Sequence, residues 1–274
     1  MLLRKFAATL LFVTGLTQAA SQAVAQDLVL AINEGVTYQD GGSTQERYRP
    51  LLDLLSRELK RTVRVVSVDK YAEFEKGLGE ERYDLVFIHP AHVGLKAVKS
   101  GKYFGLATAK GFTDYRARVL VSGNSPFKSI EDLRGKKIGV PSMESITTVM
   151  FTAALRDLKF DHPEKAFTAT RYQDAVPFMV ENKFVDAGVT GSGAVAKAWV
   201  SKGGKVIAEA KPVAIKQFLA SRKLADADRA RVQALMLGLS GSDAGRAALG
   251  KINMSGFVPW DTAVMNEATA RLAL

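Results

Sequence analysis

The chain has 274 residues, a formal net charge of +10 at pH 7 and no cysteine. Without cysteine, neither a disulfide bond nor a lipid-anchored N-terminal cysteine can form. The basic residues are spread over predicted helices, such as 57–61 and 222–231, and are not clustered with aromatic side chains. This pattern indicates a solvated basic surface and argues against a nucleic-acid partner.

The first 25 residues have the features of a secretory signal peptide. Arg4 and Lys5 precede an apolar run at 6–16, and residues 23–25 read A-V-A, a cleavage site of the A-x-A type. The apolar run is too short to span a membrane stably. We therefore expect cleavage before Gln26 and a mature protein in the periplasm.

From residue 28 onward, apolar runs of strand length alternate with segments of helical periodicity. The predicted strands are 28–32, 63–68, 84–88, 103–109, 118–122, 138–140, 166–169, 185–189 and 206–208. The predicted helices are 46–60, 71–78, 91–100, 174–181, 193–202, 226–239 and 243–249. Alternation of this kind predicts an α/β fold with βαβ units and parallel sheets.

Two segments divide the predicted elements into lobes. Residues 110–115 read K-G-F-T-D-Y and form a plausible crossing, and the chain is expected to return from Lys211. The prediction is lobe 1 at 26–111 and 212–274 and lobe 2 at 112–211, joined by a hinge of two crossings. Ligand pockets favour the cleft between such lobes.

The segment 136–156 reads as a short buried strand, a turn at Pro141 and then a helix that starts at Ser142 or Ser145. Where a strand turns directly into a helix, the first backbone N–H groups stay unpaired at the positive end of the helix dipole. Together with hydroxyls from Thr147 and Thr148, this arrangement predicts an anion site. The alternative interpretation is an ordinary serine cap.

Two further loops follow the carboxyl ends of strands, where ligands bind in open α/β sheets. They are 33–38, which contains Tyr38, and 89–92, which contains His89 and His92. The two histidines are hydrogen-bond candidates at the cleft or simple helix-capping residues. A metal site is disfavoured, because the remaining histidine, His162, lies in a predicted loop and no cysteine is present.

The chain resembles the phosphonate/phosphite-binding group of periplasmic solute-binding proteins, which serve ABC importers. The residues that carry the resemblance are Y-R-P-L-L-D-L-L-S-R-E-L at 48–59, Y-D-L-V-F-I-H-P-A-H at 83–92, S-P-F-K-S-I-E-D-L-R-G-K-K-I-G-V at 125–140, Q-D-A-V at 173–176, V-D-A-G at 185–188 and G-F-V-P-W-D at 256–261. The resemblance implies the type II periplasmic binding protein fold, capture of a small oxyanion by hinge closure, and delivery to a permease in the cytoplasmic membrane.

Some positions depart from the pattern of that group. Met143 and Glu144 interrupt the Ser/Thr-rich turn, His89 stands where glycine is common, and Gln173 stands where histidine is common. Glu144 is either a helix-start residue stabilised by the dipole or a partner for an ammonium group. The second interpretation favours a zwitterionic or amine-bearing ligand.

We expect a binding protein and not an enzyme, because cysteine, a G-x-S-x-G motif and a Gly-Lys phosphate loop are all absent from the sequence. A ligand sensor for a membrane signalling partner is the remaining alternative. The prediction is a monomer without cofactor or metal. Its predicted ligand-binding residues are Tyr38, His89, His92, Tyr115, Ser142, Glu144, Ser145, Thr147, Gln173 and Thr190.

Overall fold

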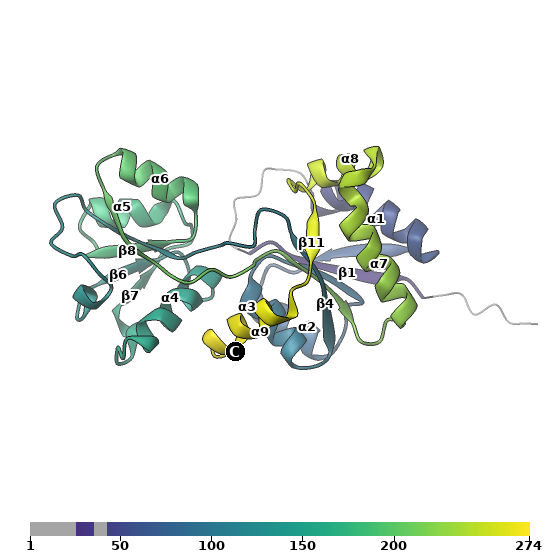
Figure 1. Cartoon of the computed structure of the whole chain (residues 1–274), viewed down its shortest axis with the longest axis horizontal. Helices are drawn as coiled ribbons and strands as arrows, with labels where there is room; N and C mark the ends of the chain where they lie inside the picture. The colour runs from purple at the N-terminus through teal and green to yellow at the C-terminus, as the bar shows by residue number, and fades with distance from the viewer. Residues whose placement is uncertain (1–25, 36–42) are drawn as a thin grey trace, which may run out of the picture.

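The computed structural model describes residues 26–35 and 43–274. The predicted signal peptide at 1–25 and the candidate residue Tyr38 lie outside the described residues. Within them the chain forms two separate β-sheets, each covered by helices on both faces, with two extended segments running between the sheets (Figure 1).

The first sheet has the strand order β11-β4-β10-β3-β1-β2. Its strands are β1 (Leu28–Asn33), β2 (Val63–Ser67), β3 (Leu85–Ile88), β4 (Tyr103–Ala109), β10 (Gln217–Ser221) and β11 (Phe257–Pro259). Its helices are α1 (Thr44–Leu59), α2 (Tyr71–Gly79), α3 (Ala91–Lys99), α7 (Asp226–Gly238) and α8 (Asp243–Lys251). Successive residues of a strand point to opposite faces. Leu30 therefore packs with α1, α7 and α8, and its neighbour Ala31 packs with α2 and α3.

The second sheet has the order β7-β6-β8-β5-β9. Its strands are β5 (Arg118–Val121), β6 (Ile138–Val140), β7 (Phe167–Ala169), β8 (Ala187–Thr190) and β9 (Lys205–Glu209). Three helices cover it: α4 (Ile146–Asp157), α5 (Ala175–Glu181) and α6 (Gly193–Ser201). Leu120 packs with Met179 of α5 and Trp199 of α6, and its neighbour Val119 packs with Phe151 of α4 on the other face.

Both sheets are mixed, so the prediction of parallel sheets was wrong for part of each. In the first sheet, β10 lies antiparallel between β3 and β4. In the second, β5 runs antiparallel to β8 and β9. These strands flank the crossings, and a chain that enters or leaves a sheet along an extended segment is not held to the parallel direction that βαβ units impose. The strands β10 and β11 and the last helix, α9 (Thr262–Arg271), were not predicted.

The two segments that connect the sheets, 110–117 and 210–216, are hydrogen-bonded to each other. Tyr115 and Val213 exchange backbone bonds of 3.2 and 2.9 Å, and the Ile215 N–H donates to the Phe112 carbonyl at 2.9 Å. A pair of connecting segments like this permits hinge motion of two bodies. The lobe boundaries at 111/112 and 211/212 remain a prediction.

Helix α9 packs beside the connecting segments and against α3 (Figure 1). Met265 and Ala268 share one hydrophobic core with Leu95 of α3 and Val213 of the return segment. The Arg271 guanidinium donates to the Pro212 carbonyl at 2.5 Å. The C-terminal helix therefore braces the junction of the two sheets.

Candidate functional site

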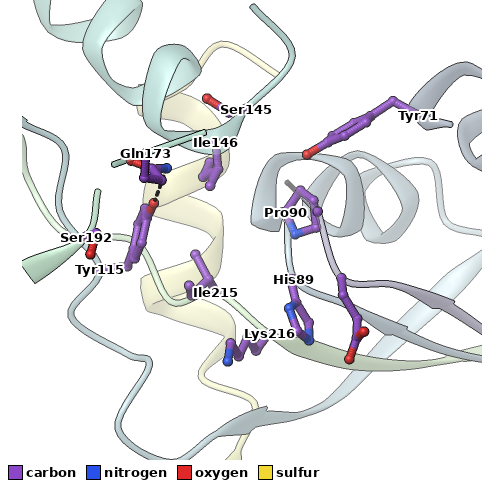
Figure 2. A pocket seen from close by; sticks show the side chains of 12 residues that line it. Tyr71, His89, Pro90, Tyr115, Ser145, Ile146, Gln173, Ser192, Ile215 and Lys216 are labelled. Carbon is purple, nitrogen blue, oxygen red and sulfur yellow. Dashed lines mark hydrogen bonds between the residues drawn. The ribbon is translucent and has the colours of Figure 1, made fainter. Parts of the chain in front are cut away.

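A cavity of about 160 Å³ lies between the two sheets, beside the connecting segments (Figure 2). A protein cavity of roughly 150 Å³ is large enough to hold a benzene molecule. The space therefore suits a small solute. Its walls come from the first sheet, from the second sheet and from both connecting segments.

The wall from the second sheet consists of helix N-termini. Ser145 caps α4, and its hydroxyl accepts from the Thr148 N–H at 3.2 Å. Ser192 caps α6 in the same way and accepts from the Val195 N–H at 3.3 Å. The first backbone N–H groups of each helix have no partner inside the helix. Because these donors coincide with the positive end of the dipole, this wall favours an anion.

Behind this wall, side chains from four segments form a closed hydrogen-bond network. The Gln173 amide nitrogen donates to Thr147 Oγ1 at 3.0 Å, and its oxygen accepts from Thr190 Oγ1 at 2.9 Å and the Gly191 N–H at 2.8 Å. The Tyr115 hydroxyl lies 2.7 Å from Thr147 Oγ1. Thr147 and Thr190 are fully buried. Their hydrogen bonds hold Tyr115 and Gln173 in position at the cavity wall.

The wall from the first sheet contains the carboxylate of Glu34, which is paired with Arg47. Glu34, just after β1, is bound by both terminal nitrogens of Arg47 and accepts from the Tyr48 hydroxyl at 2.9 Å. Burial raises the pKa of Glu34, but the hydrogen bonds from Arg47 and Tyr48 and the charge of Arg47 outweigh burial and lower it. Glu34 therefore stays ionised, with its charge balanced by Arg47.

His89 lines the cavity, and His92 lies behind it. Within the described residues, neither ring nitrogen of His89 makes a hydrogen bond of normal length and angle, although both are buried and the ring interacts with the Glu34 backbone. The His92 ring stacks on Tyr71 at a centroid distance of 5.9 Å. Burial lowers the pKa of each histidine to about 3. Both rings are therefore neutral at neutral pH.

Because the two histidines are buried in the neutral form, we expect the protein to lose stability in acid. Histidine titrates near pH 6.5 when unfolded and His92 near pH 3 when folded, so between these values the unfolded chain binds the extra proton. The stability is complete above about pH 6.5 and falls toward pH 3 by up to about 1.4 kcal/mol per pH unit for each such histidine.

Urea unfolding between about pH 7.5 and 4.5 measures this slope. His92→Gln should make it shallower, because one of the two protonation sites is gone. His162→Gln is the matched control, since the His162 side chain is 70% exposed and hydrated in both states. An unchanged slope in His92→Gln would contradict the assignment.

Lys216 brings a positive charge to the cavity. It follows Ile215 on the return segment, and its Nζ lies 3.6 Å from the centroid of the Phe112 ring. No carboxylate within residues 26–35 and 43–274 forms an ion pair with this ammonium group. Burial lowers the pKa of Lys216 to about 8 against the opposing influence of Glu34, so the side chain is cationic at neutral pH.

The structure gathers some of the predicted residues at the cavity and leaves others outside it. His89, Tyr115, Ser145 and Gln173 line it, and Thr147 and Thr190 lie beneath as hydrogen-bond partners. The residues that do not line it are His92, Ser142 and Glu144.

Ser142 and Glu144 lie outside because α4 starts after Ser145. The Ser142 carbonyl accepts from Thr148 Oγ1 at 2.6 Å and from the Ser145 N–H at 3.1 Å, so Ser142 closes the turn before the helix. Glu144 is exposed, and its N–H donates to the Ser142 hydroxyl at 3.3 Å.

Eight lining residues were outside the predicted set of ligand-binding residues: Glu34, Gly35, Tyr71, Pro90, Ile146, Ser192, Ile215 and Lys216. Tyr71 and Ser192 stand at helix starts that follow predicted strands, which was an available signal. Ile215 and Lys216 precede β10, a strand that the hydrophobic pattern did not reveal, so no sequence signal marked them.

A family model described as "ABC transporter, phosphonate, periplasmic substrate-binding protein" matches residues 35–264. The chain belongs to this family. Members are the periplasmic solute-binding components of ABC transporters, so the protein binds a small solute, works with a membrane permease and is not an enzyme. No match was found among curated proteins.

Solved structures share the fold of this phosphonate-family protein. The XAC2383 protein of Xanthomonas citri, bound to ATP, matches with a TM-score of 0.75 at 16% identity, covering 90% of this chain and 97% of that one. PhnD1 of Prochlorococcus marinus, in complex with methylphosphonate, matches with a TM-score of 0.66 at 16% identity, covering 89% and 96%. The periplasmic aliphatic sulphonate binding protein SsuA of Escherichia coli matches with a TM-score of 0.59 at 16% identity, covering 90% and 85%. These likenesses establish the type II periplasmic binding protein fold predicted for the chain.

In the described part of this phosphonate-family protein, none of the helices has the length and apolar character needed to cross a membrane.

Proposed function

We propose that the cavity captures a small oxyanion of the phosphonate, phosphite or phosphate type. The observation that carries this proposal is the convergence of the N-termini of α4 and α6 on a cavity that the cationic residue Lys216 also lines. Unpaired N–H groups and a cation favour negative charge. The carboxylate at the cavity, Glu34, is balanced by Arg47.

The relatives of known fold support this ligand class. PhnD1 was solved with methylphosphonate, and SsuA is a binding protein for aliphatic sulphonates. The amine-bearing alternative rested on Glu144, which is exposed and does not line the cavity. An oxyanion is therefore the better supported ligand.

The proposal includes the working form of the protein. Residues 1–25 are a signal peptide that is removed, and the mature protein is a periplasmic monomer. Its lobes, 26–111 with 212–274 and 112–211, close on the ligand by hinge motion along the connecting segments. The predicted contacts Ser145, Tyr115, Gln173 and His89 surround the ligand in the closed form.

Thermal unfolding of the chain that starts at Gln26 tests the proposal. The panel contains phosphate, phosphite, methylphosphonate, 2-aminoethylphosphonate, sulfate and amino acids. A ligand at about 100 times its dissociation constant adds roughly 2.7 kcal/mol, which raises the melting temperature by several degrees. Shifts with the phosphorus oxyanions support the proposal. A shift with amino acids and none with oxyanions would overturn it.

Ser145→Ala tests the position of the site. Loss of an N-cap hydroxyl costs about 1 kcal/mol of stability, and here the same change removes a hydroxyl from the cavity. Ser242→Ala is the matched control, because Ser242 caps α8 through an equivalent bond of 3.1 Å and does not line the cavity. We expect both variants to lose stability, Ser145→Ala the more because Ser145 is buried and its hydroxyl also lies 3.0 Å from Thr148 Oγ1, and a weaker oxyanion affinity, by calorimetry, in Ser145→Ala alone. An oxyanion affinity of Ser145→Ala equal to that of Ser242→Ala would contradict the placement of the site at the N-terminus of α4.

A further inference from the structure

The cavity has two polar ends with an apolar middle (Figure 2). One end holds Ser145 and Gln173, near the start of α4, and the other holds His89 and Lys216. Between them lie the side chains of Ile146, Pro90 and Ile215. The function proposed above counts the charge of Lys216 toward attraction of an anion and His89 among the contacts, but it assigns no separate ligand group to this second end.

The second end carries a positive charge that no direct ion pair neutralises within the described residues. Lys216 has no ion-pair partner among the described residues, and Glu34 is engaged by Arg47 and Tyr48. The Lys216 backbone N–H donates to the His89 carbonyl at 3.2 Å, and its ammonium group rests on the Phe112 ring. The ammonium group therefore lies over the Phe112 ring, and its charge adds to burial in lowering the pKa of His89.

His89 adds a buried hydrogen-bonding group. Its ring nitrogens are buried, and neither makes a hydrogen bond of normal length and angle within residues 26–35 and 43–274, although the ring interacts with the Glu34 backbone. Buried polar groups in proteins nearly always have a partner. A neutral imidazole supplies one N–H donor and one acceptor. A ligand group that accepts a hydrogen bond would satisfy the donor.

We propose that His89 and Lys216 form a second anion-binding subsite. It binds the carboxylate of a short phosphonocarboxylate whose phosphonate group lies at the N-terminus of α4. This inference rests on the proposed function and narrows its ligand class. The subsite offers one positive charge and a neutral donor, which suits a singly charged carboxylate better than a second doubly charged phosphonate. The apolar middle accommodates the short carbon linker.

Calorimetric titration at neutral pH with phosphonoacetate and with methylphosphonate tests the subsite. Methylphosphonate has the phosphonate group but no carboxylate. A hydrogen-bonded charged contact contributes enough to change affinity by about tenfold or more. The wild-type protein should therefore bind phosphonoacetate at least about tenfold more tightly than methylphosphonate.

Lys216→Met should weaken phosphonoacetate at least about tenfold more than it weakens methylphosphonate, so that the preference disappears. Lys211→Met is the matched control: Lys211 is exposed on the same segment and does not line the cavity, so the preference should persist. Thermal unfolding of each variant confirms that it is folded.

Each other outcome has one meaning. Equal wild-type affinities for the two ligands overturn the subsite and leave the proposed function standing. Equal weakening of both ligands in Lys216→Met also overturns it, since Lys216 would then act on the phosphonate group. Absence of binding by both ligands and by every oxyanion of the thermal panel overturns the proposed function and this inference with it.

Discussion

Replacing Arg47 by methionine should lower the free energy of unfolding by about 3–5 kcal/mol. The side chains of Glu34 and Arg47 are only 7% and 18% exposed, so the change leaves a buried carboxylate that keeps its hydrogen bond from Tyr48 but has lost its paired cation. An uncompensated buried charge is among the most destabilising consequences of a single substitution. Urea unfolding at neutral pH measures the loss.

The double variant Arg47→Met with Glu34→Gln separates the charge from the packing. It should recover part of the loss, because the buried carboxylate is gone. Arg246→Met is the control: Arg246 pairs with Asp243 at the surface, with side chains 56% and 100% exposed, and its loss should change stability by less than about 1 kcal/mol. A similarly small change in the free energy of unfolding of Arg47→Met would show that the Glu34–Arg47 ion pair does not stabilise the first-sheet side of the cavity.

Replacing Gly191 by alanine should damage the ligand site more than the fold. A Cβ at this position would lie 1.8 Å from the Tyr115 hydroxyl oxygen and 2.6 Å from Thr147 Oγ1. Tyr115 must move, which breaks its contact with Thr147 and displaces it from the cavity wall. Overpacking of this kind costs about 1–3 kcal/mol, and we expect the oxyanion affinity to fall by roughly 10- to 100-fold.

Gly250→Ala is the matched control for this substitution. A Cβ at Gly250, inside α8, meets no heavy atom within 4 Å, so alanine should raise stability by about 0.5–1 kcal/mol through helix propensity and leave affinity unchanged. Calorimetry and urea unfolding on the same samples give both quantities. Unaltered ligand affinity in Gly191→Ala would show that the position of Tyr115 is unimportant for binding.

The hydrophobic pattern predicted the strands that form continuous apolar runs, such as β1 and β4, because burial on both faces leaves a clear signal. It missed β10, where the buried polar residues Gln217 and Ser221 form the two ends of the strand and leave an apolar run of only 218–220. It also missed β11, which has only three residues. The direction of β10 depends on the route of the return segment, which is a tertiary property without a local pattern.

The candidate site was predictable where it depends on a strand that turns into a helix. Ser145 is such a residue, because a serine before a helical pattern signals an N-cap. Lys216 was not predictable in this way. In the sequence, a lysine between the return segment and the strand β10 is indistinguishable from an ordinary surface residue. Only the pairing of the two connecting segments brings it to the cavity beside His89.

The most direct measurement is a crystal structure of the mature protein with the oxyanion that stabilises it most. We predict the oxyanion within hydrogen-bond distance of the backbone N–H groups of Ile146 and Thr147, with Ser145 beside it and the two sheets closer together than in the ligand-free protein. A ligand bound outside this cavity, or one bound at the exposed carboxylate of Glu144, would contradict the account.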